Sequence, residues 1–147
     1  MIDRDTGWYF TPTSVKGIVL DADHKVLLAR NPRGEWELPG GWPDATDDSP
    51  EATVTREVLE ETGLNISVKD LVDCAMISVG AEGRVLLVFY RCIAPSFDEL
   101  RRSPEHELLQ AFSGDEIQGL APQQLNPVYQ RAIELALKEP AKRKDSM

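Results

Sequence analysis

Cysteine and histidine are scarce in this chain of 147 residues, which holds two of each. Cys74 and Cys92 show no C-x-x-C spacing and have no His nearby, so a zinc site is excluded and we expect two buried thiols without a catalytic role. If the strands on either side of Gly80 form a hairpin, Cys74 faces about residue 89 and Cys92 about residue 71, so no disulfide is expected.

Basic residues are also few, and long apolar runs are missing. Lys and Arg number 16 against 25 Asp and Glu, for a net charge of −9. This balance argues against a protein that binds the nucleic-acid backbone, because that mode needs clustered Lys and Arg. No run approaches the length of a membrane-spanning helix, and the N-terminus lacks the basic-then-apolar pattern of a signal peptide. We therefore expect no nucleic-acid partner and no membrane segment, and place the chain in the cytoplasm.

The composition, 41% hydrophobic and 28% charged, is typical of a soluble globular protein. The length suits one domain with a proper core and is too short for two ordinary ones. We expect a single domain over residues 1–139 and a flexible, polar C-terminal tail over residues 140–147. A homodimer is left open.

Alternating apolar stretches and turn signals predict six strands and three helices. The strands are expected at residues 15–20, 25–30, 35–38, 65–79, 84–94 and 107–112, and the helices at residues 50–62, 115–120 and 126–138. The run Val85–Tyr90 is apolar at every position, which is typical of a strand that is covered on both faces.

The first of these helices has clear boundaries. Ser49 is a suitable N-cap, Pro50 suits the first helical position, and Gly63 suits the left-handed residue that ends a helix. At about 100° per residue, one set of side chains is expected to pack and another to form an anionic face. The packing set is Ala52, Thr55, Val58, Leu59 and Thr62; the anionic set is Glu57, Glu60 and Glu61.

The anionic face is unfavourable for a helix that only has to be stable. Each like-charge pair costs a few tenths of a kcal/mol, and the macrodipole disfavours anions near the C-terminus by roughly 0.3–1 kcal/mol each. A divalent cation would reverse both penalties, and carboxylate oxygens are the ligands that Mg²⁺ and Mn²⁺ prefer. The alternative is an ordinary solvated acidic face.

The segment before the helix supports a site. Paired glycines at Gly40 and Gly41 allow a backbone path that side chains would block. The following loop contains Asp44, Asp47 and Asp48, but it lacks the alternating ligands and closing Glu of an EF-hand. We interpret it as a loop with turn and capping residues, with room for one carboxylate to face the site.

Together these residues resemble the signature of the Nudix hydrolases, G-x5-E-x7-R-E-U-x-E-E-x-G-U, where U is aliphatic. Arg56–Leu64 matches the second half at every specified position. The first half departs from the pattern. Counting back from Arg56 places Asp48 where the family has Glu, and six residues instead of five separate it from Gly41. In the family this Glu supports the motif partly by engaging the Arg, a role we expect Asp48 to take through a shifted loop.

The resemblance implies an α/β fold, namely an α/β/α sandwich with a mixed sheet, and a metal-dependent pyrophosphohydrolase. Such an enzyme takes a small nucleotide-derived substrate, a nucleoside diphosphate linked to another moiety, and a water molecule attacks phosphorus. The implied cofactor is Mg²⁺ or Mn²⁺. The implied metal ligands are Glu57, Glu61, Glu60 and the Gly41 carbonyl.

The catalytic residues that the resemblance implies are Glu60, Glu61, Arg56 and Glu105. Arg56 is expected to orient the carboxylates. The general base is Glu60 or an acid of a late loop, where we favour Glu105.

The substrate is not identified, because neither the Pro nor the Tyr that marks some subfamilies stands about fifteen residues beyond the motif. Two other functions are compatible with the sequence: a nucleotide-binding sensor of the same fold without turnover, and an acidic protein-interaction module.

Overall fold

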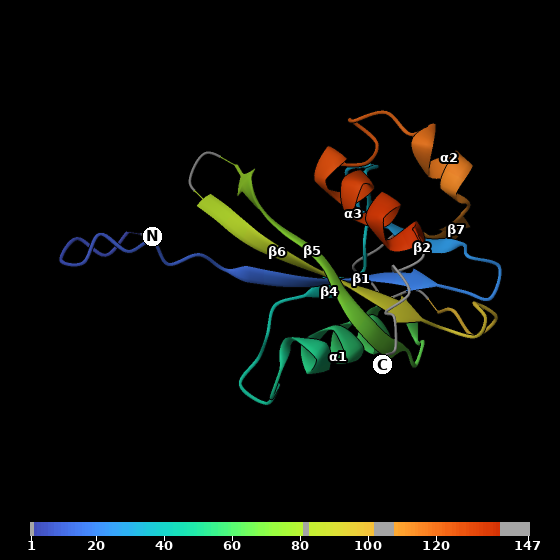
Figure 1. Cartoon of the computed structure of the whole chain (residues 1–147), viewed down its shortest axis with the longest axis horizontal. Helices are drawn as coiled ribbons and strands as arrows, with labels where there is room; N and C mark the ends of the chain where they lie inside the picture. The colour runs from blue at the N-terminus through green and yellow to red at the C-terminus, as the bar shows by residue number, and fades with distance from the viewer. Residues whose placement is uncertain (1, 81–82, 102–107, 139–147) are drawn as a thin grey trace, which may run out of the picture.

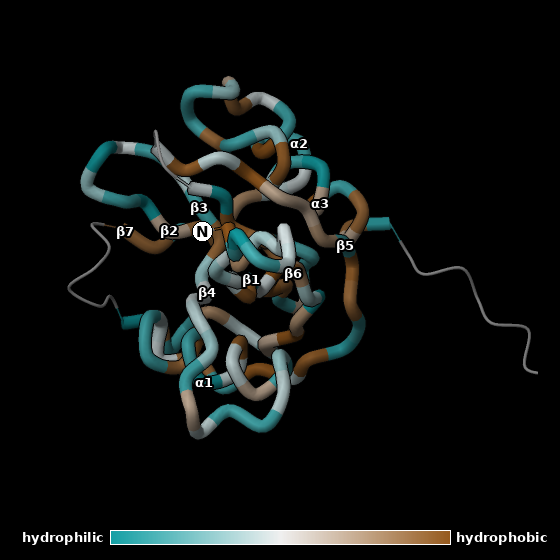
Figure 2. Tube along the Cα trace, turned by 90° about the vertical axis from the view of Figure 1, so that its left-hand side faces the viewer, coloured by the Kyte–Doolittle hydropathy of each residue, from teal (hydrophilic) through white to brown (hydrophobic). Residues whose placement is uncertain are grey.

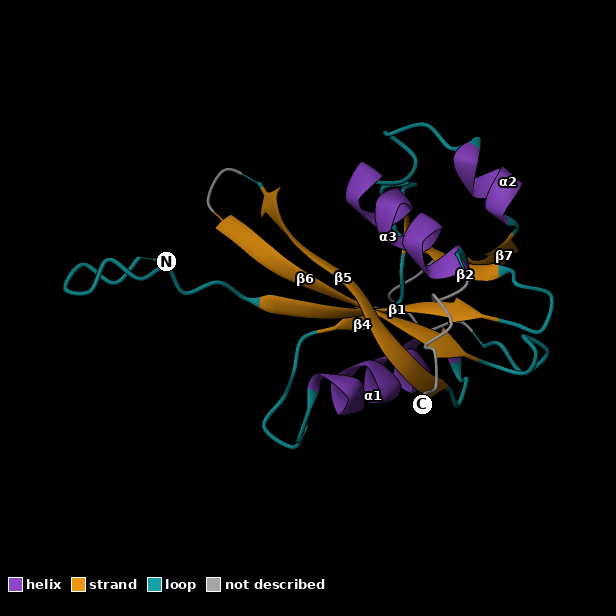
Figure 3. Cartoon of the chain, viewed as in Figure 1, coloured by secondary structure: helices purple, strands orange, loops and turns teal. Residues whose placement is uncertain are grey.

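A twisted sheet runs through the middle of the molecule and separates one helix from two others (Figure 1 and Figure 3). The computed structural model describes residues 2–80, 83–101 and 108–138. Its strands are β1 (Thr13–Leu20), β2 (Val26–Arg30), β3 (Trp36–Glu37), β4 (Gly40–Gly41), β5 (Ser67–Val79), β6 (Gly83–Ile93) and β7 (Leu108–Phe112). Its helices are α1 (Pro50–Thr62), α2 (Gly114–Gln118) and α3 (Pro127–Leu137).

The seven strands form one mixed sheet in the order β3-β2-β1-β6-β5, with β4 added to β1 and β7 to β2. β1 and β6 are parallel from Thr13↔Leu86 to Leu20↔Ile93, and the other pairs are antiparallel. α1 covers one face, and α2 and α3 cover the other (Figure 1). The predicted α/β/α sandwich with a mixed sheet is confirmed.

The first hairpin opens after a single pair, which makes space for the glycines. β1 and β2 share only the Leu20↔Val26 pair, and β2 then pairs along its whole length with β7. The edge of β1 that β2 leaves is taken by β4, with Lys16↔Gly40 and Val15↔Gly41. The sheet thus holds the glycine pair beside the start of β1.

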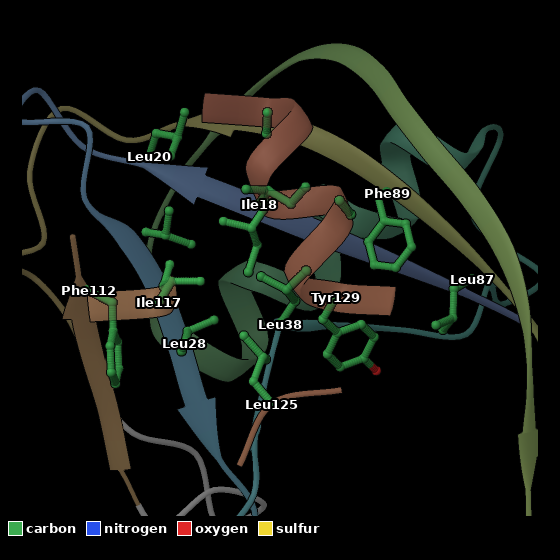
Figure 4. Packing of buried hydrophobic residues seen from close by; sticks show 14 residues of the cluster. Ile18, Leu20, Leu28, Leu38, Leu87, Phe89, Phe112, Ile117, Leu125 and Tyr129 are labelled. Atoms are coloured by element: carbon green, nitrogen blue, oxygen red, sulfur yellow. The ribbon is translucent and has the colours of Figure 1, made fainter. Parts of the chain in front are cut away.

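Two hydrophobic cores lie on opposite faces of the same strands. On β6, Leu87 and Phe89 point to the α3 side, while Val88 and Tyr90 point to the α1 side. Figure 4 shows the α3-side cluster, in which Phe89 packs edge-on to Tyr129 at 5.8 Å between ring centres. Figure 2 shows the strands between α1 below and α2 and α3 above. The prediction that this apolar strand is covered on both faces is confirmed.

The caps of α1 are as predicted, but its packing face is rotated. The Ser49 hydroxyl accepts a hydrogen bond from the Ala52 N–H, and Gly63 ends the helix with a φ of 78°. The buried side chains are Thr53, Val54, Val58, Glu61 and Thr62. The predicted faces were wrong at Thr55 and Leu59, which are exposed, and at Glu61, which is buried. The reason is that α1 meets the sheet over Gly17 of β1, where the missing side chain lets Val54 and Val58 pack closely. Glu61 therefore lies at the edge of the core.

The prediction of two buried thiols was right for Cys92 and wrong for Cys74. Cys92 is buried in the α1-side core, whereas Cys74 is exposed on β5. β5 has only β6 beside it among the described strands, and α1 does not reach over Cys74. The two residues face Val88 and Val68 across the β5–β6 pair, so neither is near the other and both are free thiols.

Within the described ranges, no helix reaches the length and apolar character that crossing a bilayer requires. The predicted domain end at residue 139 and the tail over 140–147 lie outside the described residues.

Candidate active site

The glycine pair of β4 lies directly over two carboxylates of α1. The Gly40 N–H donates to Glu61 Oε2 at 2.8 Å. At Gly41, a Cβ would lie 2.6 Å from Glu57 Oε2 and 2.7 Å from Oε1, so only glycine leaves room for the carboxylate. Glu57 and Glu61 are one helical turn apart, and both reach the same two-residue strand. This close approach is a physical reason for glycine at residue 41.

A second glycine brings the helix close to the sheet. A Cβ at Gly17 of β1 would lie 3.1 Å from Val54 and 3.2 Å from Val58, the two valines that α1 packs on β1. The Gly17 N–H also donates to the Pro39 carbonyl at 2.8 Å. Gly17 therefore fixes both the depth of α1 and the start of β4, the two elements that form the site.

Arg56 links the loop before α1 to the glutamates. Its Nε and Nη2 donate to the two oxygens of Asp47 at 3.0 and 2.8 Å, and Nη2 also donates to the Trp42 carbonyl at 3.1 Å. Nη1 lies 3.0 Å from Glu57 Oε1 and 3.4 Å from Glu60. The bidentate ion pair with Arg56 holds the pKa of the Asp47 carboxyl well below its usual range. The same pair raises the pKa of the Arg56 guanidinium.

The prediction that Asp48 engages Arg56 was wrong, because Asp47 does so. Asp48 is exposed, whereas the Asp47 side chain is only 5% exposed. Counting from Gly41, Asp47 keeps the family spacing of five residues, and the extra residue falls between it and Arg56. The prediction counted from Arg56, so it assigned the insertion to the wrong side of the acid.

Sequence reasoning also missed two groups that hold Asp47. The Thr53 hydroxyl donates to Asp47 Oδ2 at 2.9 Å, and the Asp44 N–H donates to the same oxygen at 3.0 Å. The spacing from Gly41 could have identified Asp47, but no pattern in the sequence points to Thr53, because a Thr in mid-helix carries no signal of its own.

The remaining predicted site residues do not all lie at the glycine pair. The Glu60 side chain is 58% exposed and lies 3.4 Å from Arg56 Nη1. Glu105 lies outside the described residues. Within those residues, no three acidic, His or Cys side chains converge on one point. The site therefore presents two carboxylates, those of Glu57 and Glu61, against the glycine pair, with Glu60 and Arg56 beside them.

This set of groups fits a hard divalent cation. The glycine gap admits the Glu57 carboxylate beside the main chain of Gly41, whose carbonyl is a further oxygen of the type that Mg²⁺ and Mn²⁺ accept. Arg56, a cationic side chain beside these carboxylates, directs Nε and Nη2 to Asp47 and to the Trp42 carbonyl. Oxygen atoms that can serve as metal ligands, from α1 and from β4, thus lie close together where the two elements touch.

Comparison with known proteins identifies the family of the chain. A model of the NUDIX domain matches residues 11–135. The chain belongs to the Nudix hydrolase family. A MutT-like protein of Streptomyces ambofaciens is 39% identical to this Nudix protein over 105 residues, which cover 71% of the chain and 65% of that relative. The chain thus spans slightly less than two thirds of the length of this curated relative.

Solved Nudix structures share the fold. The MutT protein from Methanosarcina mazei Go1 superposes with a TM-score of 0.73 at 25% identity, covering 88% of this chain and 96% of that one. An ADP-ribose pyrophosphatase from Streptococcus suis superposes with a TM-score of 0.66 at 29% identity, covering 87% and 90% of the two chains.

Proposed function

We propose that this Nudix protein is a divalent-cation-dependent pyrophosphohydrolase that cleaves a nucleoside diphosphate linked to another moiety. The observation that carries the proposal is the contact of the Glu57 carboxylate with Gly41, beside the Glu61 bond to Gly40. Family membership supports the reaction class, and one similar structure is an ADP-ribose pyrophosphatase.

The chain's own residues take the following roles in this proposal. Glu57, Glu61 and the Gly41 carbonyl hold Mg²⁺ or Mn²⁺, and Glu60 adds an outer carboxylate. When bound, the cation offsets phosphate charge and lowers the pKa of the attacking water. Arg56 orients the Glu57 carboxylate. The base is Glu60, whose exposed carboxylate can accept a proton at the surface of the site, or Glu105, which lies outside the described residues.

A bound cation would also reduce the repulsion between this acidic chain and a phosphorylated substrate. A chain of net charge −9 repels a diphosphate, and the glutamates of α1 concentrate that charge at the site. Bound Mg²⁺ or Mn²⁺ offsets two negative charges there. Substrate binding should therefore depend on the metal as strongly as turnover does, which gives the proposal a second observable.

The test is release of nucleoside monophosphate or phosphate from ADP-ribose, nucleotide sugars, dinucleoside polyphosphates and nucleoside triphosphates. Each is assayed with Mg²⁺ or Mn²⁺, with and without chelator. Glu57→Gln is the test variant, and Glu134→Gln on the exposed face of α3 is the matched control. We expect metal-dependent turnover of at least one compound, a loss of at least about a hundredfold in Glu57→Gln, and wild-type rates in the control.

Two outcomes would overturn the proposal. Absence of turnover with thermal stabilisation by a nucleotide would indicate a sensor. Absence of both, with binding of a basic protein that survives chelation and Glu57→Gln, would indicate an interaction module.

A further inference from the structure

The hydroxyl of Thr53 is a buried polar group that the proposed reaction does not use. Thr53 lies on the core side of α1, one turn before Arg56, and is 0% exposed. Its hydroxyl donates to Asp47 Oδ2 at 2.9 Å and lies 3.3 Å from the Ser49 carbonyl. A helical Thr can satisfy its hydroxyl with the carbonyl four residues earlier. Here the shorter bond goes to the loop, so the hydroxyl acts on Asp47.

Asp47 needs this support because of its place in the motif. It is one methylene shorter than the Glu of the family pattern, and one extra residue separates it from Arg56. Three donors nevertheless converge on its Oδ2, from Thr53, the Asp44 N–H and Arg56, while Oδ1 accepts from Arg56 Nε. The Asp47 carboxylate, on a loop one residue longer than in the family pattern, is thus fixed by four hydrogen bonds.

We propose that Thr53 is a positioning residue that fixes Asp47 and, through it, limits the contact of Arg56 with Glu57 to the Nη1 group. Arg56 has five N–H donors in a planar fork, of which Nε and Nη2 are directed to Asp47 and only Nη1 to the glutamates. If Asp47 shifts, the guanidinium turns toward Glu57 and competes with a cation for its oxygens. This role rests on the proposed function only where metal binding is concerned.

The test uses three Thr variants of the full chain. Thr53→Val removes the hydroxyl and keeps the branched shape, and Thr53→Ser restores the donor. Thr55→Val is the matched control, because Thr55 lies on the same helix, is exposed, and donates only to the Glu51 carbonyl at 2.8 Å. If Thr53→Val fails to fold, Thr53→Ala removes the same donor without a second methyl group.

Two readouts separate this inference from the proposed function. The first is the NMR signal of the Arg56 Nε–H in metal-free protein, which reports the bond to Asp47 directly. The second is the affinity for Mn²⁺, followed by electron paramagnetic resonance. We expect Thr53→Val to broaden or shift the Nε–H signal and to weaken Mn²⁺ binding roughly tenfold, with Thr53→Ser and Thr55→Val close to wild type.

An unchanged Nε–H signal in folded Thr53→Val or Thr53→Ala would overturn the role of Thr53, whether or not the protein is an enzyme. A changed signal with wild-type Mn²⁺ affinity would overturn its effect on the metal. Failure of the wild-type protein to bind Mn²⁺ or turn over any compound would overturn the proposed function, while the metal-free signal would still decide the role of Thr53.

Discussion

Replacing Gly41 with Ala should strongly lower activity and leave the fold intact. The added methyl group would lie 2.6 and 2.7 Å from the two oxygens of Glu57, whereas ordinary contacts begin at 3.4 Å. The carboxylate carbon of Glu57 would lie closer still, so the carboxylate must move by about 1 Å. Misplacement by about 1 Å can cost about a hundredfold in rate, so we expect Gly41→Ala to lower kcat/KM by about that factor. The obstructed group is the end of a flexible side chain, so stability should fall by less than about 1 kcal/mol.

The neighbouring glycine provides the contrast. At Gly40 the φ is +152°, and a Cβ would overlap the Val15 carbonyl and lie 2.8 Å from Lys16 Cα. These are backbone atoms of β1 and cannot move aside. Gly40→Ala should therefore destabilise the fold by about 2–4 kcal/mol. Gly83→Ala is the neutral control, because its Cβ would meet nothing within 4 Å.

The assay pairs urea unfolding with kcat/KM and Mn²⁺ affinity for the three variants. The midpoint of unfolding should drop clearly only in Gly40→Ala. Wild-type kcat/KM and Mn²⁺ affinity in Gly41→Ala would refute the reasoning, because Glu57 would then not need the space that glycine leaves. Unfolding of Gly41→Ala would refute it differently, by showing that Glu57 cannot move away.

Three further outcomes are expected. Asp47→Ala should lower activity by about 10- to 100-fold through loss of the partner of Arg56, whereas Asp48→Ala should stay near wild type; equal losses in both would contradict the assignment. The pKa of Asp47 is lower in the folded chain than its ordinary value of about 3.9, so its stabilising effect is complete above that pH and is lost below it. The stability difference between wild type and Asp47→Asn should therefore be constant from about pH 8 to 5 and shrink below about pH 4 in urea unfolding. Burial raises the pKa of Cys92 to about 12, so a thiol reagent at about pH 8 should modify exposed Cys74 at once and Cys92 only after unfolding.

The individual elements and the limits of α1 could be predicted from the sequence because their signals are local, whereas the layered arrangement followed from the family resemblance. Ser49, Pro50 and Gly63 mark the helix ends through backbone geometry that neighbouring residues determine. The apolar run of β6 required cover on both faces whatever its partners were. Local patterns of this kind do not depend on how distant segments pack.

The details of the site depended on distant contacts and were less predictable. The rotation of α1 follows from the gap at Gly17, a residue far away in sequence, so periodicity alone placed Thr55 and Leu59 inside. The choice between Asp47 and Asp48 depended on where an inserted residue loops out, which spacing from one end cannot show. Thr53 was missed because its hydroxyl contacts a loop that the helix pattern does not describe.

The strands that support the site belong to both cores. β1 sends Val15 and Val19 toward α1 and Ile18 and Leu20 toward α3, and β6 alternates in the same way. Loss of packing in either core should therefore also disturb β1 and β6, which the other core shares. Loosening of α3, on the face opposite the glutamates, should thus also loosen α1 through β1. We expect thermal unfolding to proceed as one cooperative transition, with the amides of β1 and β6 the last to exchange with solvent.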